Sequence, residues 1–222
     1  EPPKAALFTD TAGTMFATIA LGSGYRSHPL NTVTQDRFFV LFDYDLPRAD
    51  LGTADDASLK TIITTPDMAV LDMASTTVKE SGVNVTNKPG WYVDLPASGE
   101  KSLASGLIFQ EKLLFTTYTP KASTVSNCSP ITGVTGTYTF CMPYGNLCVD
   151  GATSYFKDNV TLGLGGEPQL LVIPEVNTST GIATGKSKVV VLVGTGIVGG
   201  IFDDLGQPTI TPAKKWREKT RK

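Results

Sequence analysis

The sequence predicts an all-β protein in which antiparallel strands are interrupted by one short, partly helical insertion. Glycine, proline and threonine are abundant, with 22, 14 and 30 residues among 222, and these residues favour turns and strands over helices. Hydrophobic residues make up 41% and charged residues 18% of the chain, a composition that supports a buried core and excludes intrinsic disorder. The apolar runs, such as Val189–Val193, have the length of strands, so no membrane span is expected.

Three strands are predicted near the N-terminus. The segments Ala6–Phe8 and Thr14–Leu21 are rich in strand-forming residues, and Asp10–Gly13 between them has the composition of a turn. The segment Arg37–Phe42 is a nearly continuous apolar run, which is typical of a strand that is buried on both faces.

Two further strand pairs are predicted in the rest of the chain. Leu107–Phe109 and Lys112–Tyr118 are apolar segments on either side of Gln110-Glu111, which predicts a hairpin. Gln169–Ile173 and Lys188–Val193 are joined by a polar loop and form the second expected pair.

The insertion between residues 45 and 88 contains the helical pattern. Either Asp55 or Asp56 is suited to cap a helix, and apolar side chains follow at helical spacing, at Leu59, Ile62 and Ile63. Pro66 limits this helix to about two turns. The stretch Met68–Ala74 is expected to add another turn.

Three cysteines lie in the region 120–150, which is expected to contain a hairpin. Cys141 and Cys148 flank a turn centred on Tyr144 and Gly145, and in that register they face each other at a distance that a disulfide can bridge. Cys128 is left free, pairs outside the segment, or competes for one of the other two thiols. Zinc binding is the rival interpretation, but CxxC spacing and a nearby histidine are missing. The disulfide would indicate an oxidising compartment.

The segment that follows Leu21 is the most unusual in the chain, with Gly22, Gly24, Tyr25, Arg26 and His28 in close succession. A glycine-rich turn after a strand can cradle an anion, but no phosphate-binding fingerprint is present. The favoured interpretation is structural. In it, the two glycines adopt positive φ, the tyrosine ring packs inside, and the basic side chains bind backbone carbonyls and carboxylates.

Candidate catalytic and metal-binding groups are scarce. Asp43, Asp45 and Asp50 could supply oxygen ligands to calcium, but Pro47 and Arg48 interrupt the usual spacing, so a solvated loop is favoured. A single histidine does not make a catalytic triad, which predicts a protein that is not an enzyme. The charges, 19 Lys and Arg against 21 Asp and Glu, argue against a nucleic-acid partner.

Four segments together resemble the PilC/PilY family of type IV pilus proteins. They match the family patterns GSGYRxHPL…QDRFY, GWYxxLxxxGEKxLA, FTTYxP…C and WRE, in that order, at residues 19–30 with 35–39, 90–95 with 99–104, 115–120 with Cys128, and 216–218. Within them, Trp91, Tyr92, Phe115 and Tyr118 are expected to be structural strand residues. The resemblance is weakest over residues 45–88 and 120–185.

The resemblance implies that residues 1–222 form the C-terminal part of a β-propeller in a longer secreted protein. A propeller blade needs roughly 40 residues or more, so this chain would supply only part of the ring. Members of the family reach the cell surface through the periplasm and outer membrane and lie at the pilus tip. Family members often carry a calcium loop, but no such loop occurs here, so no cofactor is expected in this segment.

The implied function is non-catalytic support of pilus biogenesis, control of retraction, and adhesion to host or abiotic surfaces. The implied partners are minor pilins, other pilus-tip proteins and the remainder of the same propeller. Two alternatives remain open: a fragment of a propeller-type quinone-dependent dehydrogenase, and a carbohydrate-binding β-domain. The second alternative would require exposed aromatic side chains, for which Trp91, Tyr92 and Trp216 are the candidates.

Overall fold

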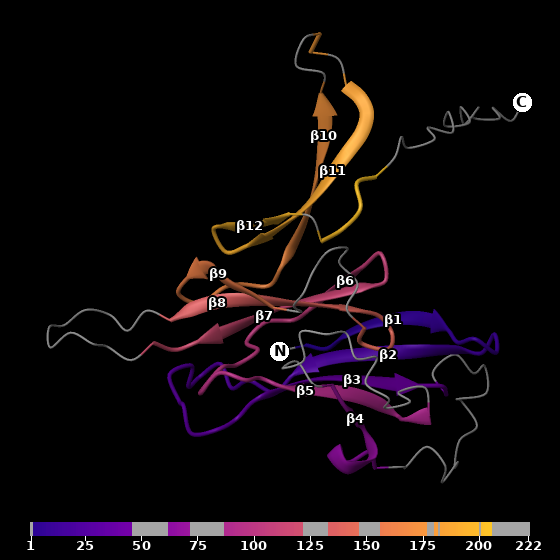
Figure 1. The fold of residues 1–222 in the computed structure, drawn as a ribbon, viewed down its shortest axis with the longest axis vertical. Helices are drawn as coiled ribbons and strands as arrows, with labels where there is room; N and C mark the ends of the chain where they lie inside the picture. Colours follow the sequence, from indigo (N-terminus) through magenta and orange to yellow (C-terminus); the bar gives the residue numbers. More distant parts are fainter. Residues whose placement is uncertain are drawn as a thin grey trace, which may run out of the picture.

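The protein is all-β, with twelve strands in three sheets among the residues that the structure describes (Figure 1). A computed structural model describes residues 2–45, 62–71, 87–121, 133–146, 156–176, 180–181, 183–199 and 201–205. The strands are β1 (Lys4–Thr9), β2 (Met15–Gly22), β3 (Arg37–Asp43), β4 (Ala69–Val70), β5 (Gly90–Asp94), β6 (Leu107–Phe109), β7 (Lys112–Thr119), β8 (Val134–Cys141), β9 (Phe156–Leu162), β10 (Gln169–Val176), β11 (Ala183–Val193) and β12 (Gly196–Gly199).

The first sheet contains five strands in the order β1-β2-β3-β5-β4. The predicted N-terminal strands are confirmed, and the Asp10 carboxylate stabilises the turn between them by accepting hydrogen bonds from the backbone N–H groups of Ala12 and Thr14. Strand β3 lies between β2 and β5 and pairs antiparallel with both. It is buried on one face only, since Phe38, Val40 and Phe42 are buried while the alternate residues are half-buried.

The second sheet contains four strands in the order β6-β7-β8-β9. The predicted hairpin at Gln110 and Glu111 is confirmed, and both residues have positive φ, 47° and 56°. Such turns normally use glycine or asparagine. Here the Gln110 side chain stabilises the turn by accepting a hydrogen bond from the Asp203 N–H (2.7 Å) and donating one to the Asp203 carbonyl (3.0 Å).

The third sheet contains three strands in the order β10-β11-β12. The predicted pairing of residues 169–173 with 188–193 is confirmed and extends to Val176 and Ala183. In Figure 1, β10 and β11 run away from the other two sheets as a projecting ribbon.

Two hydrophobic cores hold the three sheets together. The larger core joins the first and second sheets and includes Phe38 and Phe115, whose rings stack with centroids 3.8 Å apart. The smaller core joins the second and third sheets through Leu114, Val189 and Val191. Leu114 lies between Leu113 and Phe115 in β7, and successive side chains of a strand point to opposite faces. The second sheet is therefore covered on both faces.

The expected helical insertion is wrong in the part that the structure describes. Residues Thr65–Asp67 form a single 3₁₀ turn, and the expected turn from Met68 to Ala74 is replaced at its start by β4. Strand β4 pairs parallel with Trp91 and Tyr92 of β5, so pairing with the sheet overrides the local helical pattern. The other residues expected to be helical, 55–61 and 72–74, lie outside the described residues.

The register predicted for the cysteine hairpin is also wrong. Cys141 lies opposite Asn146 and not Cys148, because the turn has four residues, with the Gly145 N–H bound to the Cys141 carbonyl (2.8 Å) and Gly145 at φ 79°. Burial raises the pKa of the Cys141 thiol. Cys128 and Cys148 lie outside the described residues, so the pairing of Cys141 with Cys148 stays a prediction.

Replacement of Phe115 by alanine is expected to lower the free energy of unfolding by about 3–5 kcal/mol, because it opens a cavity where the first two sheets meet. Val33→Ala is the control, since Val33 is 92% exposed and its truncation should change stability by no more than about 0.5 kcal/mol. Denaturant unfolding measures both variants. Equal midpoints would contradict this placement of Phe115.

Candidate functional site

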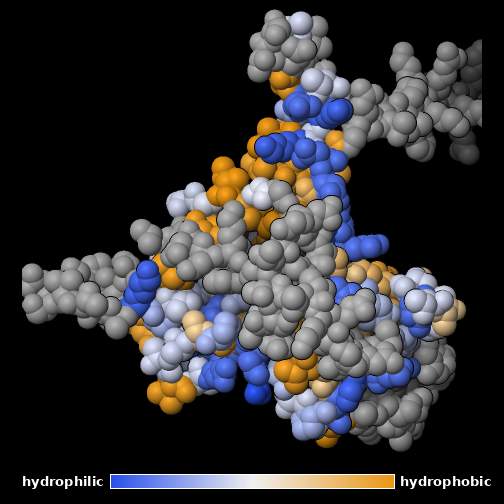
Figure 2. Space-filling view, viewed as in Figure 1, coloured by the Kyte–Doolittle hydropathy of each residue, from blue (hydrophilic) through white to orange (hydrophobic). Residues whose placement is uncertain are grey.

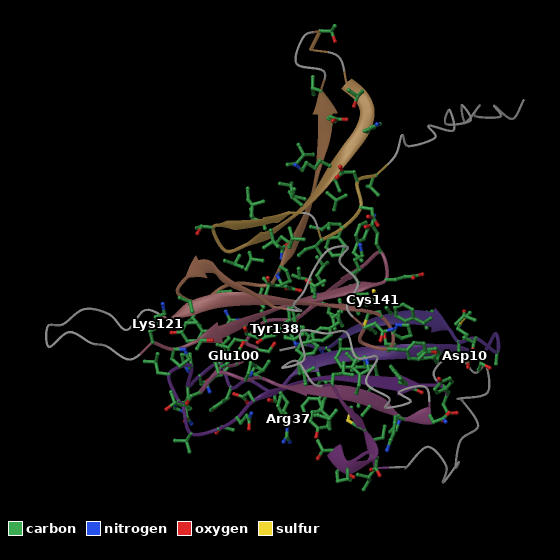
Figure 3. All side chains as sticks on the ribbon, in the orientation of Figure 1. Asp10, Arg37, Glu100, Lys121, Tyr138 and Cys141 are labelled. Atoms are coloured by element: carbon green, nitrogen blue, oxygen red, sulfur yellow. The ribbon has the colours of Figure 1, made fainter. Side chains whose placement is uncertain are left out.

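The candidate site is the loop of residues 23–36 between β2 and β3, together with the buried polar groups beneath it. We call these groups, together with the exposed Ser23 that binds one of them, the anchor network. Its members are Ser23, Asp36, Glu100, Lys101, Thr117 and Tyr138. They come from the loop, from the segment that follows β5, and from β7 and β8. Figure 3 shows Glu100 and Tyr138 close together between the first two sheets.

A buried ion pair fastens the end of the loop. The Lys101 Nζ donates to Asp36 Oδ2 at 3.3 Å, and the two side chains are only 2% and 7% exposed. The other Asp36 oxygen accepts a hydrogen bond from the Ser23 hydroxyl at 2.9 Å. The Ser23 hydroxyl in turn accepts the Arg37 N–H at 2.8 Å. The two ends of the loop are therefore tied to each other and to Lys101.

Glu100 is the second buried charge, at 1% exposure, and hydrogen bonds satisfy both of its oxygens. Oε1 accepts from the hydroxyls of Thr117 (2.7 Å) and Tyr138 (3.0 Å). Oε2 accepts from the Ala97 N–H (3.1 Å). The backbone of the next residue, Lys101, exchanges two hydrogen bonds with Tyr118 of β7. The anchor network therefore joins the loop to the second sheet.

Gly22 and Gly24 are needed because the backbone passes close to Ser102, and not for positive φ as expected. A Cβ at Gly24 would lie 2.3 Å from the Ser102 carbonyl oxygen, and one at Gly22 would lie 2.5 Å from the Ser102 side chain. The Ser102 hydroxyl is buried and has no hydrogen-bond partner. This close contact fixes the path of the chain as it leaves β2.

The outer part of the loop is exposed. Tyr25 is 62% exposed, which contradicts the expectation that its ring packs inside, and it lies 5.0 Å from the ring of His28, which is also exposed. The His28 N–H binds the Tyr25 carbonyl, and the Asn31 N–H binds the His28 carbonyl. Residues Ser27 to Asn31 line an open hollow of about 550 Å³. Arg26 is exposed as well, so the side chains of Tyr25, Arg26 and His28 lie at the surface, above the anchored ends of the loop.

The four predicted strand-motif residues lie in β5 and β7 and are buried. Trp91 is fully buried and donates its indole N–H to the Pro143 carbonyl (2.7 Å), and Tyr92 is 8% exposed. Phe115 is buried in the larger core, and the Tyr118 hydroxyl accepts the Gly133 N–H (3.2 Å). Because Trp91 and Tyr92 are buried, they cannot form an exposed platform for a sugar ring. Trp216 lies outside the described residues.

Arg37 lies on the opposite face of the first sheet from the anchor network. Its Nε binds Asp94 Oδ1 at 2.6 Å, and its guanidinium lies 5.1 Å from the ring centroid of Tyr92. The hydrogen bond to Asp94 raises the pKa of Arg37. The pair is 40% and 38% exposed, so it contributes little to stability.

No cluster of three or more metal-ligating side chains occurs in the described part of the chain. Calcium binding by Asp43, Asp45 and Asp50 was the disfavoured alternative for this loop. The Asp43 carboxylate accepts a hydrogen bond from the Asp45 N–H (2.9 Å), which forms a local turn, and Asp50 lies outside the described residues. Among the residues with described positions, no helix has the length and hydrophobicity to cross a membrane.

The sequence did not predict the anchor network, although its charged members lie within the family-like segments. Asp36 is part of QDRF, Glu100 and Lys101 are part of GEKSLA, and Ser23 is part of GSGYR. Charged residues next to strongly apolar strands were the available signal, because charges are buried only when they are paired.

Replacement of Asp36 by alanine is expected to lower the free energy of unfolding by about 3–5 kcal/mol, because it leaves the buried Lys101 ammonium without its partner. Lys101→Met and the double variant complete a double-mutant cycle, measured by denaturant unfolding. The double variant should lose less stability than the sum of the two single losses. Additive losses would show that the two charges do not interact.

Gly24→Ala is expected to lower the free energy of unfolding by about 1–3 kcal/mol, because the new methyl group meets a backbone oxygen that cannot move freely. Gly166→Ala is the matched control, since a Cβ there would meet nothing within 4 Å. Thermal unfolding of both variants separates the effect of close contact from the general effect of replacing glycine. Equal melting temperatures would contradict the contact with Ser102.

Comparison of the chain with protein-family models, with curated proteins and with solved structures gave no match. The functional proposal therefore rests on the loop 23–36, the anchor network and the arrangement of the three sheets.

Proposed function

We propose that this chain is a non-catalytic module of a pilus-tip protein similar to the PilC/PilY family. The anchor network is the observation that carries the proposal. The three family-like segments within the described residues are far apart in sequence, yet Ser23, Asp36, Glu100 and Lys101 from two of them meet in the anchor network, and Tyr118 from the third binds the backbone of Lys101. Segments that contact one another in a single buried cluster act as one structural unit, which favours a shared origin over separate chance matches.

The loop 23–36 is the proposed contact surface for protein partners. Binding residues commonly lie on loops that a rigid scaffold holds in place. Here the base is fixed by the buried pair of Asp36 and Lys101, while Tyr25 and Leu30 are 62% and 46% exposed. An exposed tyrosine beside a histidine suits a protein interface, in which aromatic residues are enriched. The proposed partners are minor pilins, other pilus-tip proteins, and host or abiotic surfaces at the cell exterior.

The propeller is part of the proposal. The first and second sheets pack face to face through the larger core, which is compatible with successive blades, and one face of the third sheet is partly open. The pairing of β10, β11 and β12 places four apolar side chains on that face, and each of them is at least 36% exposed: Leu171, Ile173, Leu192 and Ile197. Figure 2 shows hydrophobic residues on the projecting sheet. The remainder of the propeller, in the longer parent protein, would cover this face.

The described carboxylates of the anchor network support a structural role over a catalytic one. Asp36 and Glu100 are buried, and both oxygens of each accept hydrogen bonds from named groups. A general acid or base must reach its substrate within hydrogen-bond distance. The hollow of Ser27 to Asn31 is lined by neither of these carboxylates.

The double variant Tyr25→Ala/His28→Ala in the parent protein is expected to reduce surface piliation, twitching or adherence while the purified module keeps its melting temperature. Both side chains are exposed, so their removal should cost little stability. Leu7→Ala is the matched control, since Leu7 is 61% exposed but lies on β1, outside the loop. Deletion of residues 1–222 from the parent should reproduce the phenotype. Normal pili and adherence after that deletion would overturn the proposed function.

A further inference from the structure

The free edge of β10 presents an unusual combination of features. Within the described residues, β10 pairs only with β11 and forms the end of its sheet. It contains the apolar run Leu170–Ile173, and Leu171, Val172 and Ile173 are each more than 40% exposed. An exposed edge strand with high β-propensity is a template for pairing with another chain. Such an edge requires protection if the protein is to stay in solution.

Hydrogen bonds of β11 show which groups of β10 face the free edge. Ser187 exchanges both backbone hydrogen bonds with Leu205, on the side away from β10. The Val189 N–H also points away, since it binds Asp204 Oδ1 (3.2 Å). In an antiparallel pair, two residues directly opposite each other either both point their N–H and C=O groups toward the other strand or both point them away from it. The partners of Ser187 and Val189 are Pro174 and Val172, so the backbone of both faces the free edge.

Pro174 therefore stands where an outward N–H would otherwise be. Alternation along the strand makes Leu170, Val172 and Pro174 the outward positions, and only the first two carry an N–H. The neighbouring Glu175 fits this pattern, because its carbonyl accepts the Thr184 hydroxyl of β11. Pro168, which directly precedes the strand, also lacks an N–H. The free edge thus has two donors between two prolines.

We propose that Pro174 prevents β10 from pairing with β10 of a second copy of this chain. Two antiparallel copies centred on Val172 would place each Pro174 opposite Leu170 of the other copy. Each of these two pairs would lack one of its two hydrogen bonds, and the proline ring would occupy the space of the missing hydrogen. Proline in a strand is tolerated at a solvent-facing edge, which matches this position. The inference does not depend on the proposed function, because it holds whichever partner covers the exposed face of the third sheet.

The test restores the missing donor. Pro174→Thr supplies an N–H and a strand-forming residue without adding an apolar side chain. We expect the self-association constant of the purified chain, measured by sedimentation velocity over a concentration series, to rise roughly tenfold or more, because two inter-chain hydrogen bonds return. An infrared band of intermolecular β-sheet should accompany the larger species. Circular dichroism checks that the variant remains folded.

A second set of variants tests the direction of the backbone groups. Val172→Pro should be tolerated, because its N–H faces the free edge, and adding it to Pro174→Thr should return the association constant to the wild-type value. Ile173→Pro should lower the melting temperature clearly, because the N–H of Ile173 faces β11. A folded Pro174→Thr variant that associates no more than wild type would overturn the proposal. Equal melting temperatures for Val172→Pro and Ile173→Pro would overturn it as well.

Discussion

The ion pair between Lys101 and Asp36 is the interaction on which the arrangement of the first two sheets depends. A buried ammonium is stable only when a partner and further hydrogen bonds compensate for lost hydration, so its position restricts all the groups around it. Asp36 begins the approach to β3, and the backbone of Lys101 is bonded to β7. The pair thus sets how the loop 23–36 meets the first and second sheets, which the larger hydrophobic core holds together.

Packing in layers explains why the second sheet is the most buried of the three. Its central strands lie between two hydrophobic cores, so β7 and β8 are buried along almost their whole length. Strand β8 does this with threonines, and the Thr135 hydroxyl is satisfied by the Gly163 carbonyl at 2.8 Å. Threonine combines a β-branched shape with a polar group that needs a partner. The loop after β9 supplies that partner.

Local pattern was sufficient to predict the all-β class and the strands whose apolar residues are contiguous, such as Arg37–Phe42 and Lys112–Tyr118. It failed for β4, because pairing with β5 sets the conformation of this segment. Strand β8 lies within the region 120–150, where a hairpin was expected but its bounds were not predicted. The anchor network could not be predicted from local pattern, because it depends on contacts between distant residues: Asp36 and Lys101 are 65 positions apart. The cysteine register failed because the turn is held by its own backbone bond and by Trp91, which binds the Pro143 carbonyl.

The hairpin at Gln110 and Glu111 has a backbone conformation that its two residue types disfavour. Two consecutive residues with side chains hold a left-handed conformation that glycine would adopt without steric cost. The side chain of Gln110 offsets that cost by binding the backbone of Asp203. The turn of the second sheet thereby binds the segment that follows the third sheet. A strained turn and a tertiary contact are therefore coupled at Gln110, so loss of its side chain would leave the turn uncompensated and would remove a contact with the segment after β12.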